Sequence, residues 1–140
     1  LRLPPQHPFN PLPILRLLTV LDGNPAAVAR AFHLIWGEGR DPTTAEVLAD
    51  VAAAGGDPSA PERINDQTTK DKLTWATMQA TDAGVFGVPT LRIGRELFWG
   101  LDAVDMALAY IDDPALFTRG EYTRIDGLPV GIRRAIPPRG

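Results

Sequence analysis

Two short stretches in the second half of the chain combine residue types that could bind a small peptide-like ligand. The first is Val88-Pro89, which directly precedes a predicted strand at residues 90–93. A peptide bond before proline can be cis at a cost of about 0.5–1 kcal/mol, and a cis bond here would turn the Val88 N–H and C=O outward, where they could pair with an extended ligand. The alternative, which the local sequence alone favours, is that Val88-Pro89 only begins the strand, where the missing N–H of proline is tolerated.

The second stretch is Gly100-Leu101-Asp102, at the predicted start of a helix. A glycine lets a ligand approach the backbone closely, and the N–H groups at a helix start can hold a carboxylate. The carboxylate of Asp102 could pair with an ammonium group. Its alternative role is that of a plain N-cap, and its two oxygens could serve both purposes.

A β-hairpin followed by a helix must position these residues. Strands are predicted at residues 90–93 and 96–99 because two β-branched and apolar runs flank the turn Gly94-Arg95. Asp102 is then expected to cap a helix that ends at Asp112-Asp113-Pro114.

The residues before the hairpin predict a mostly helical segment. Apolar residues recur every three to four positions, and prolines, glycines and a capping box of Thr43 and Glu46 separate the runs. The predicted helices span about 12–22, 25–37, 43–55 and 68–83, with a short helical piece at 62–66. In the last of the four, the expected inner stripe consists of Leu73, Ala76, Thr77, Ala80 and Ala83, whereas Trp75 and Met78 fall outside it.

Composition excludes several kinds of chemistry. The 140 residues contain no cysteine, which rules out disulfides, thiolate metal sites and dithiol redox catalysis by this chain. His7 and His33 are too far apart in the sequence to suggest a metal site. The net charge of −3 gives no general attraction to nucleic acid or to an anionic membrane. No apolar run approaches the roughly 20 residues that span a bilayer and no signal-peptide pattern opens the chain, so we expect a cytoplasmic protein.

Two motifs give the chain a specific resemblance. Val85–Thr90 and Glu96–Asp102 together resemble the C-terminal half of the 2-hydroxychromene-2-carboxylate isomerases. These glutathione-dependent enzymes belong to the DsbA-like, kappa-class glutathione transferase branch of the thioredoxin superfamily. The similarity extends back to Phe32–Gly39 and Pro8–Leu12, and it covers roughly residues 1–112. The two motifs at this spacing are far more specific than either motif alone.

The resemblance implies an α/β, thioredoxin-like fold of the DsbA/kappa subfamily with an inserted helical subdomain. Residues 1–113 would form a partial thioredoxin-like domain, with the mostly helical insertion at 12–84 and the hairpin and C-terminal helix at 85–113. The N-terminal β-α half, including the serine that activates glutathione, would precede this chain. Leu1–Leu3 would then be the end of a strand. Upstream residues or a second chain, as in a homodimer, would complete the sheet, unless the sheet is distorted there.

Residues 114–140 differ from the rest and are expected to form an extended basic tail. Their apolar residues show little periodicity, and five arginines outnumber Glu121 and Asp126. Arginines alone do not indicate a nucleic-acid interface, so the tail is expected to be solvated or to pack on the body or on a neighbouring chain.

For the ligand, the resemblance implies that the Val88-Pro89 backbone pairs with the cysteinyl part of glutathione. Its γ-glutamyl end would meet Trp99, Gly100, Leu101 and Asp102. In the family the glutathione thiol adds to a conjugated aromatic substrate, permits rotation about the former double bond and then leaves. Asn10, with His7 or Phe9, is the candidate for binding that small aromatic substrate.

No catalytic residue can be assigned from the resemblance. The only serine, Ser59, does not match the family's activating serine. Two alternatives therefore stay open: a kappa-like glutathione transferase, which shares every motif seen here, and a DsbA-like interaction module without catalysis.

Overall fold

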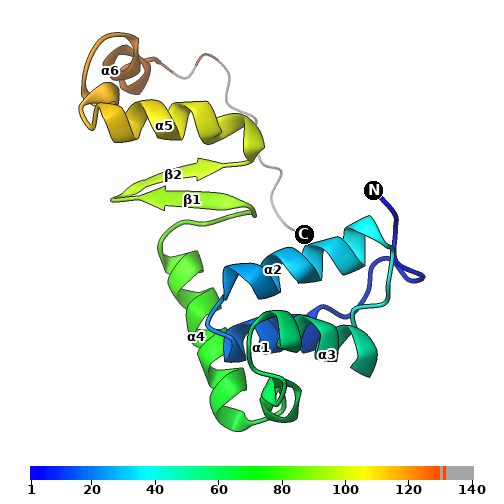
Figure 1. Ribbon diagram of the computed structural model, residues 1–140. Helices are drawn as coiled ribbons and strands as arrows, with labels where there is room; N and C mark the ends of the chain where they lie inside the picture. Colours follow the sequence, from blue (N-terminus) through cyan, green and yellow to red (C-terminus); the bar gives the residue numbers. More distant parts are fainter. Residues whose placement is uncertain (130, 132–140) are drawn as a thin grey trace, which may run out of the picture. The chain divides into compact units, whose positions relative to one another are not determined.

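The computed structural model describes residues 1–129 and 131, whose backbone forms two compact units (Figure 1). The first unit is Leu1–Ala83 and the second begins at Gly84. The first unit is helical and the second adds a two-stranded sheet, so the chain has the predicted α/β composition. Within these residues, no helix is both long enough and apolar enough to cross a membrane.

Four α-helices form the first unit, and all four predicted helices are confirmed. Its elements are α1 (Leu12–Val20), α2 (Pro25–Phe32), the π-helical turn η1 (His33–Gly37), α3 (Ala45–Ala54), the 3-10 turn η2 (Ala60–Arg63) and α4 (Gln67–Asp82). Helix α2 has Pro25 at its first position, and Oδ1 of Asn24 accepts hydrogen bonds from the N–H groups of Ala26 and Ala27.

The cap of α3 lies one residue later than the predicted capping box. The hydroxyl of Thr44 accepts a hydrogen bond from the N–H of Val47 at 3.4 Å, so Thr44 is the N-cap. The hydroxyl of Thr43 instead donates to Asp41 at 2.7 Å. The hydrogen bonds from Thr43, that of its side chain first, hold the pKa of the Asp41 carboxyl below its ordinary value. Two adjacent threonines offered the same cap, and only the preceding turn decided between them.

The core of the first unit lies between α1, α2, η1 and α3. Its most deeply buried large side chains are Leu17, Leu34, Val47 and Val51. Helix α2 packs along α3, and α1 contacts α2, α3 and α4. Burying one such side chain contributes about 1.5–3 kcal/mol relative to leaving it in water, so this cluster is a substantial source of stability.

The predicted inner stripe of α4 is largely wrong. Leu73 is half-buried, but Ala76, Thr77 and Ala80 are exposed, and Thr69 is the one buried residue of the helix. Helix α1 is the main element that packs along α4. A single neighbouring helix covers only a narrow strip, so most of the weakly apolar face of α4 stays in water.

The second unit begins with the predicted hairpin. Strands β1 (Thr90–Ile93) and β2 (Glu96–Trp99) pair antiparallel, and the turn is Gly94-Arg95. Residue pairs run from Thr90 opposite Trp99 to Ile93 opposite Glu96. After the hairpin come the 3-10 turn η3 (Leu101–Ala103) and helix α5 (Val104–Asp112), which packs on both strands.

The expectation of an extended tail is wrong for residues 116–126. They form the 3-10 turn η4 (Leu116–Thr118) and helix α6 (Glu121–Asp126). The boundary predicted at residue 113 therefore does not separate a body from a tail, because η4 contacts α5 within the second unit. Arg133, Arg134 and Arg139 lie outside the described residues.

Aromatic contacts explain why this segment folds back. The ring of Phe117 stacks on Tyr110 with 5.3 Å between centroids, and it lies 6.1 Å from Phe98 of β2. Tyr122 of α6 meets Phe117 edge-on at 5.0 Å. Each such pair contributes about 0.5–1.5 kcal/mol beyond the burial of its area. These rings come from four different elements, so sequence periodicity could not connect them.

The strand predicted at Leu1–Leu3 is also wrong, since these residues have no regular secondary structure. The N–H of Arg2 donates to the carbonyl of Trp36 at 2.7 Å, at the end of η1. A strand needs a partner strand to satisfy its backbone, and here a helix end takes that hydrogen bond instead.

Candidate functional site

The backbone at Val88, just before the hairpin, is a donor–acceptor pair that is unpaired among the described residues. The Val88-Pro89 peptide bond is cis, which is one of the two alternatives that the sequence left open. Val88 is 86% exposed. Its N–H and C=O form no hydrogen bond with any other described residue. Val88 can therefore pair with the main chain of an extended ligand in the way that a β-strand does.

The hairpin brings Gly100-Leu101-Asp102, the second predicted stretch, next to the Val88 backbone. Thr90 pairs with Trp99 in the strand register, and the N–H of Gly100 donates to the carbonyl of Pro89 at 2.9 Å. Val88 precedes this hydrogen-bonded pair on one strand, and Leu101 follows it on the other. Val88 and Leu101, which are distant in sequence, thus flank one backbone hydrogen bond.

Gly100 is the residue at which the chain turns out of β2. Its backbone has φ of 90° and ψ of 166°, a conformation that is essentially restricted to glycine. A Cβ atom added there would also lie 2.5 Å from Oδ1 of Asp102. Both the turn and the close position of the Asp102 carboxylate therefore require a glycine.

The prediction that Asp102 caps the following helix is wrong. Asp102 lies inside η3, whose N-cap is Gly100, and Ala103 is the N-cap of α5; neither cap uses a side-chain hydrogen bond. The reason is the extra 3-10 turn, which moves the start of α5 to Val104. The exposed carboxylate of Asp102 forms no ion pair or hydrogen bond with the rest of the described chain, so it is available to an external cation.

Gly87, Phe86 and Thr90 also lie at this site, and the sequence did not single them out. The indole of Trp99 lies directly over Gly87, where an added Cβ would be 2.6 Å from its Nε1. The ring of Phe86 is tilted against Trp99 with 5.2 Å between centroids, and Phe86 is largely exposed. The hydroxyl of Thr90 donates to the carbonyl of Gly87 at 2.6 Å. The only signal for the last contact was the tendency of threonine to bond a carbonyl three residues earlier.

The candidate substrate residues belong to the first unit. Oδ1 of Asn10 accepts a hydrogen bond from the N–H of Leu12, the first residue of α1, at 3.1 Å, while the amide nitrogen has no partner among the described residues. His7 and Phe9 both lie against Trp36, with ring centroids 5.7 and 5.9 Å from the indole. The second unit thus brings together Val88, Pro89, Trp99, Gly100, Leu101 and Asp102, and Asn10 is not part of it.

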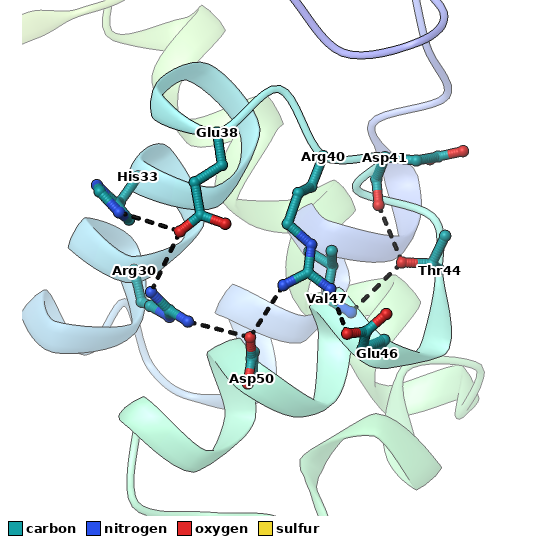
Figure 2. A network of polar contacts seen from close by, with 9 residues as sticks. All are labelled: Arg30, His33, Glu38, Arg40, Asp41, Thr44, Glu46, Val47 and Asp50. Carbon is teal, nitrogen blue, oxygen red and sulfur yellow. Dashed lines mark hydrogen bonds and ion pairs between the residues drawn. The ribbon is translucent and has the colours of Figure 1, made fainter. Parts of the chain in front are cut away.

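A network of charged side chains crosses the surface of the first unit (Figure 2). Asp50 on α3 receives Arg30 at 3.1 Å and Arg40 at 3.3 Å, and Arg40 also pairs with Glu46 at 2.7 Å. Glu38 joins Arg30 to His33. These pairs connect α2, η1 and α3, and all are at least a quarter exposed, so the network has a structural role. His33 is exposed and is joined to this network through Glu38. Among the described residues, no group of three or more potential ligands is placed to hold a metal ion.

Comparisons with known proteins give consistent matches. The model of the DSBA-like thioredoxin domain family matches residues 1–112. The 2-hydroxychromene-2-carboxylate isomerase of Sphingobium xenophagum is 34% identical over 90 residues, which are 63% of this chain and 46% of that protein. Proteins of the same name from Pseudomonas putida and Pseudomonas sp. strain C18 are each 35% identical over 83 residues, or 58% of this chain and 41% and 39% of theirs. The chain thus spans less than half the length of these relatives. No solved structure matches it.

Proposed function

The chain belongs to the family of DSBA-like thioredoxin domains, and we propose that it forms the glutathione-holding part of a 2-hydroxychromene-2-carboxylate isomerase. Family membership confirms the predicted thioredoxin-like fold and the resemblance from which it was inferred. The names of three relatives support an isomerase. Because the chain covers less than half of those relatives, the activity is proposed for the whole protein that contains it.

The observation that carries the proposal is the pair of free groups on either side of the Pro89–Gly100 hydrogen bond. On one side, the Val88 N–H and C=O lack partners among the described residues. On the other, the Asp102 carboxylate is exposed beside Gly100. Glutathione carries a peptide main chain in its middle and both an ammonium and a carboxylate at its γ-glutamyl end, so these residues fit it.

Each residue would hold a different part of the ligand. The Val88 backbone would form a short antiparallel bridge with the cysteinyl residue. Asp102 would pair with the α-ammonium group, and the backbone N–H of Leu101 would meet the α-carboxylate. The indole of Trp99 would cover the ligand from the side. When bound, glutathione supplies the thiol that adds to the conjugated substrate and is eliminated after rotation about the former double bond.

We assign no thiol-activating residue among the described residues. The hydroxyl of Ser59 is already hydrogen-bonded to Asp57 at 2.8 Å. It is therefore not a free donor for a thiolate. The DsbA-like interaction module without catalysis therefore stays a second candidate, and the activity of the whole protein decides between the two.

Asn10 is the proposed contact for the aromatic substrate. Its oxygen is committed to Leu12, which fixes the side chain and leaves the amide N–H groups to donate to a substrate carboxylate. His7 and Phe9, held against Trp36, would offer ring surface to the aromatic part.

Glutathione titration tests the binding site. Isothermal calorimetry on the wild-type chain and on Asp102→Ala should show affinity about 10-fold or more lower in the variant, since hydrogen bonds to charged groups contribute about 1.5–3 kcal/mol. Asp105→Ala is the matched control, because it removes an exposed carboxylate three residues further along. Equal affinities for Asp102→Ala and the wild type contradict the assigned site.

The reaction itself is tested on the longer protein. Turnover of 2-hydroxychromene-2-carboxylate is expected, with no conjugation of glutathione to a halonitrobenzene. Conjugation of glutathione to the halonitrobenzene without turnover of the chromene identifies a transferase of the kappa type. Absence of both activities identifies the non-catalytic module.

We also propose that a further strand pairs with the hairpin in the working protein. Within the described residues the sheet has two strands, β1 and β2, which is fewer than independent stability usually needs. Native mass spectrometry of the protein from its source distinguishes a longer chain from a homodimer. The proposed location is the cytoplasm.

A further inference from the structure

The peptide unit that carries the Val88 N–H is held in place by the chain itself. This unit also contains the carbonyl of Gly87, to which the hydroxyl of Thr90 donates at 2.6 Å. An amide group is planar, and in the trans form its C=O and N–H point in opposite directions. Fixing the Gly87 carbonyl therefore fixes the direction in which the Val88 N–H points.

A second contact restrains the same unit. The indole of Trp99 covers Gly87 so closely that an added Cβ would lie 2.6 Å from Nε1 and 3.2 Å from Cδ1 and Cε2. Rotation of the Gly87 backbone toward another conformation would push against this ring. On the far side of Val88, the carbonyl of Pro89 is held by the N–H of Gly100 at 2.9 Å.

From these contacts we propose that Thr90 and Gly87 are positioning residues for the Val88 main chain. Thr90 occupies the Gly87 carbonyl and so directs the Val88 N–H outward, and Gly87 provides the space in which the Trp99 indole lies. This inference rests on the proposed function for its ligand, glutathione, but it also makes a statement about the free protein. Neither residue touches the reacting atoms; both act through Val88.

The competing explanation is that Thr90 merely stabilises the loop before β1. Thr90→Val separates the two explanations, because valine keeps the β-branched shape and the strand propensity but lacks the hydroxyl. Thr90→Ser restores the hydroxyl without the methyl group. Thr118→Val is the matched control, since the Thr118 hydroxyl also donates to a carbonyl three residues earlier, that of Ala115, at 2.9 Å.

The test uses ¹H–¹⁵N correlation spectra of the free chain. The Val88 amide resonance should move and broaden in Thr90→Val, keep its wild-type position in Thr90→Ser, and stay unchanged in Thr118→Val. Gly87→Ala should displace the indole N–H resonance of Trp99. An unchanged Val88 resonance in Thr90→Val overturns the inference.

Glutathione binding then supplies a separate readout. If Thr90 positions the Val88 main chain, Thr90→Val weakens glutathione binding about 3- to 10-fold, while the urea midpoint stays within error of the wild type. Thr90→Ser then regains the wild-type affinity. Equal affinity of Thr90→Val and wild type overturns the inference and leaves the proposed function standing. A wild-type chain that does not bind glutathione contradicts the proposed function, whereas the amide spectra still decide the role of Thr90.

Discussion

The two units of the chain differ in how completely they bury their apolar residues. In the first, twelve hydrophobic residues form one buried cluster. In the described part of the second, Phe98 and Ala107 are the buried hydrophobic residues, and Met106, Leu108 and Ile111 of α5 are exposed. A group of helices can close a core with its own neighbours, whereas a hairpin with one covering helix leaves apolar faces without a second layer.

This difference bears on function because the candidate site lies in the less buried unit. Val88, Leu101 and Trp99 are exposed apolar residues there, beside backbone groups that lack partners among the described residues. The surface of the first unit carries ion pairs (Figure 2) and also exposed apolar residues, among them Phe32, Trp75 and Met78. The proposed binding site is therefore distinguished by exposed apolar residues together with backbone groups that lack partners among the described residues.

The largest expected effect is a difference in stability between two variants, each of which truncates one leucine in one of the units. Leu17→Ala in the core of the first unit should lower the free energy of unfolding by about 2–5 kcal/mol, because it leaves a cavity. Leu108→Ala on the exposed side of α5 should change it by no more than about 0.5 kcal/mol. Urea denaturation followed by circular dichroism measures both. A large effect of Leu108→Ala would mean that a partner covers α5 in solution and would remove the contrast between the units.

A smaller effect is expected from Gly100, which follows β2, and from Gly94, which lies in the turn between the strands. Gly100→Ala should cost about 1–3 kcal/mol, since its backbone conformation excludes other residues and the new Cβ meets the Asp102 carboxylate. It should also weaken glutathione binding by displacing Asp102. Gly94→Asn is the control: Gly94 has φ of 62° with open space around it, a turn conformation that asparagine tolerates. Equal stability of the two variants would contradict the assigned role of Gly100.

The smallest effect concerns the charged surface of the first unit. Asp50→Ala removes the carboxylate shared by Arg30 and Arg40 and should cost no more than about 1 kcal/mol, because the pairs are partly exposed. The loss should shrink in 1 M salt, where the screening length is about 3 Å. Thermal unfolding of Asp50→Ala and of the double variant with Arg40→Ala, at low and high salt, measures the coupling. A loss that persists unchanged in high salt would assign Asp50 a packing role instead.

Much of the fold followed from the sequence because it depends on neighbouring residues. The leucine period of α1, Pro25 at the start of α2 and the Gly94-Arg95 turn each act within a few positions. The same local reasoning failed where two adjacent residues offered the same cap, as Thr43 and Thr44 did, and where an extra 3-10 turn displaced the predicted cap Asp102.

The candidate site divides in the same way. The sequence identified Val88, Pro89 and Asp102 by residue type and by resemblance, and the hairpin register that joins them follows from the turn. The contacts of Trp99 with Gly87 and Phe86 and of Thr90 with Gly87 were not predictable, because they depend on side-chain directions in a loop without periodicity.

By itself, the sequence determined the helices, the hairpin and the residue types at the candidate site. The helices and the hairpin follow from hydrogen bonding and apolar spacing within single elements. Only the tertiary structure decided which faces are buried: it left most of α4 in water, folded residues 116–126 back through Phe117, and took Leu1–Leu3 out of any strand. Burial and strand pairing require a contact with a distant part of the chain, and no local sequence pattern specifies whether that contact forms.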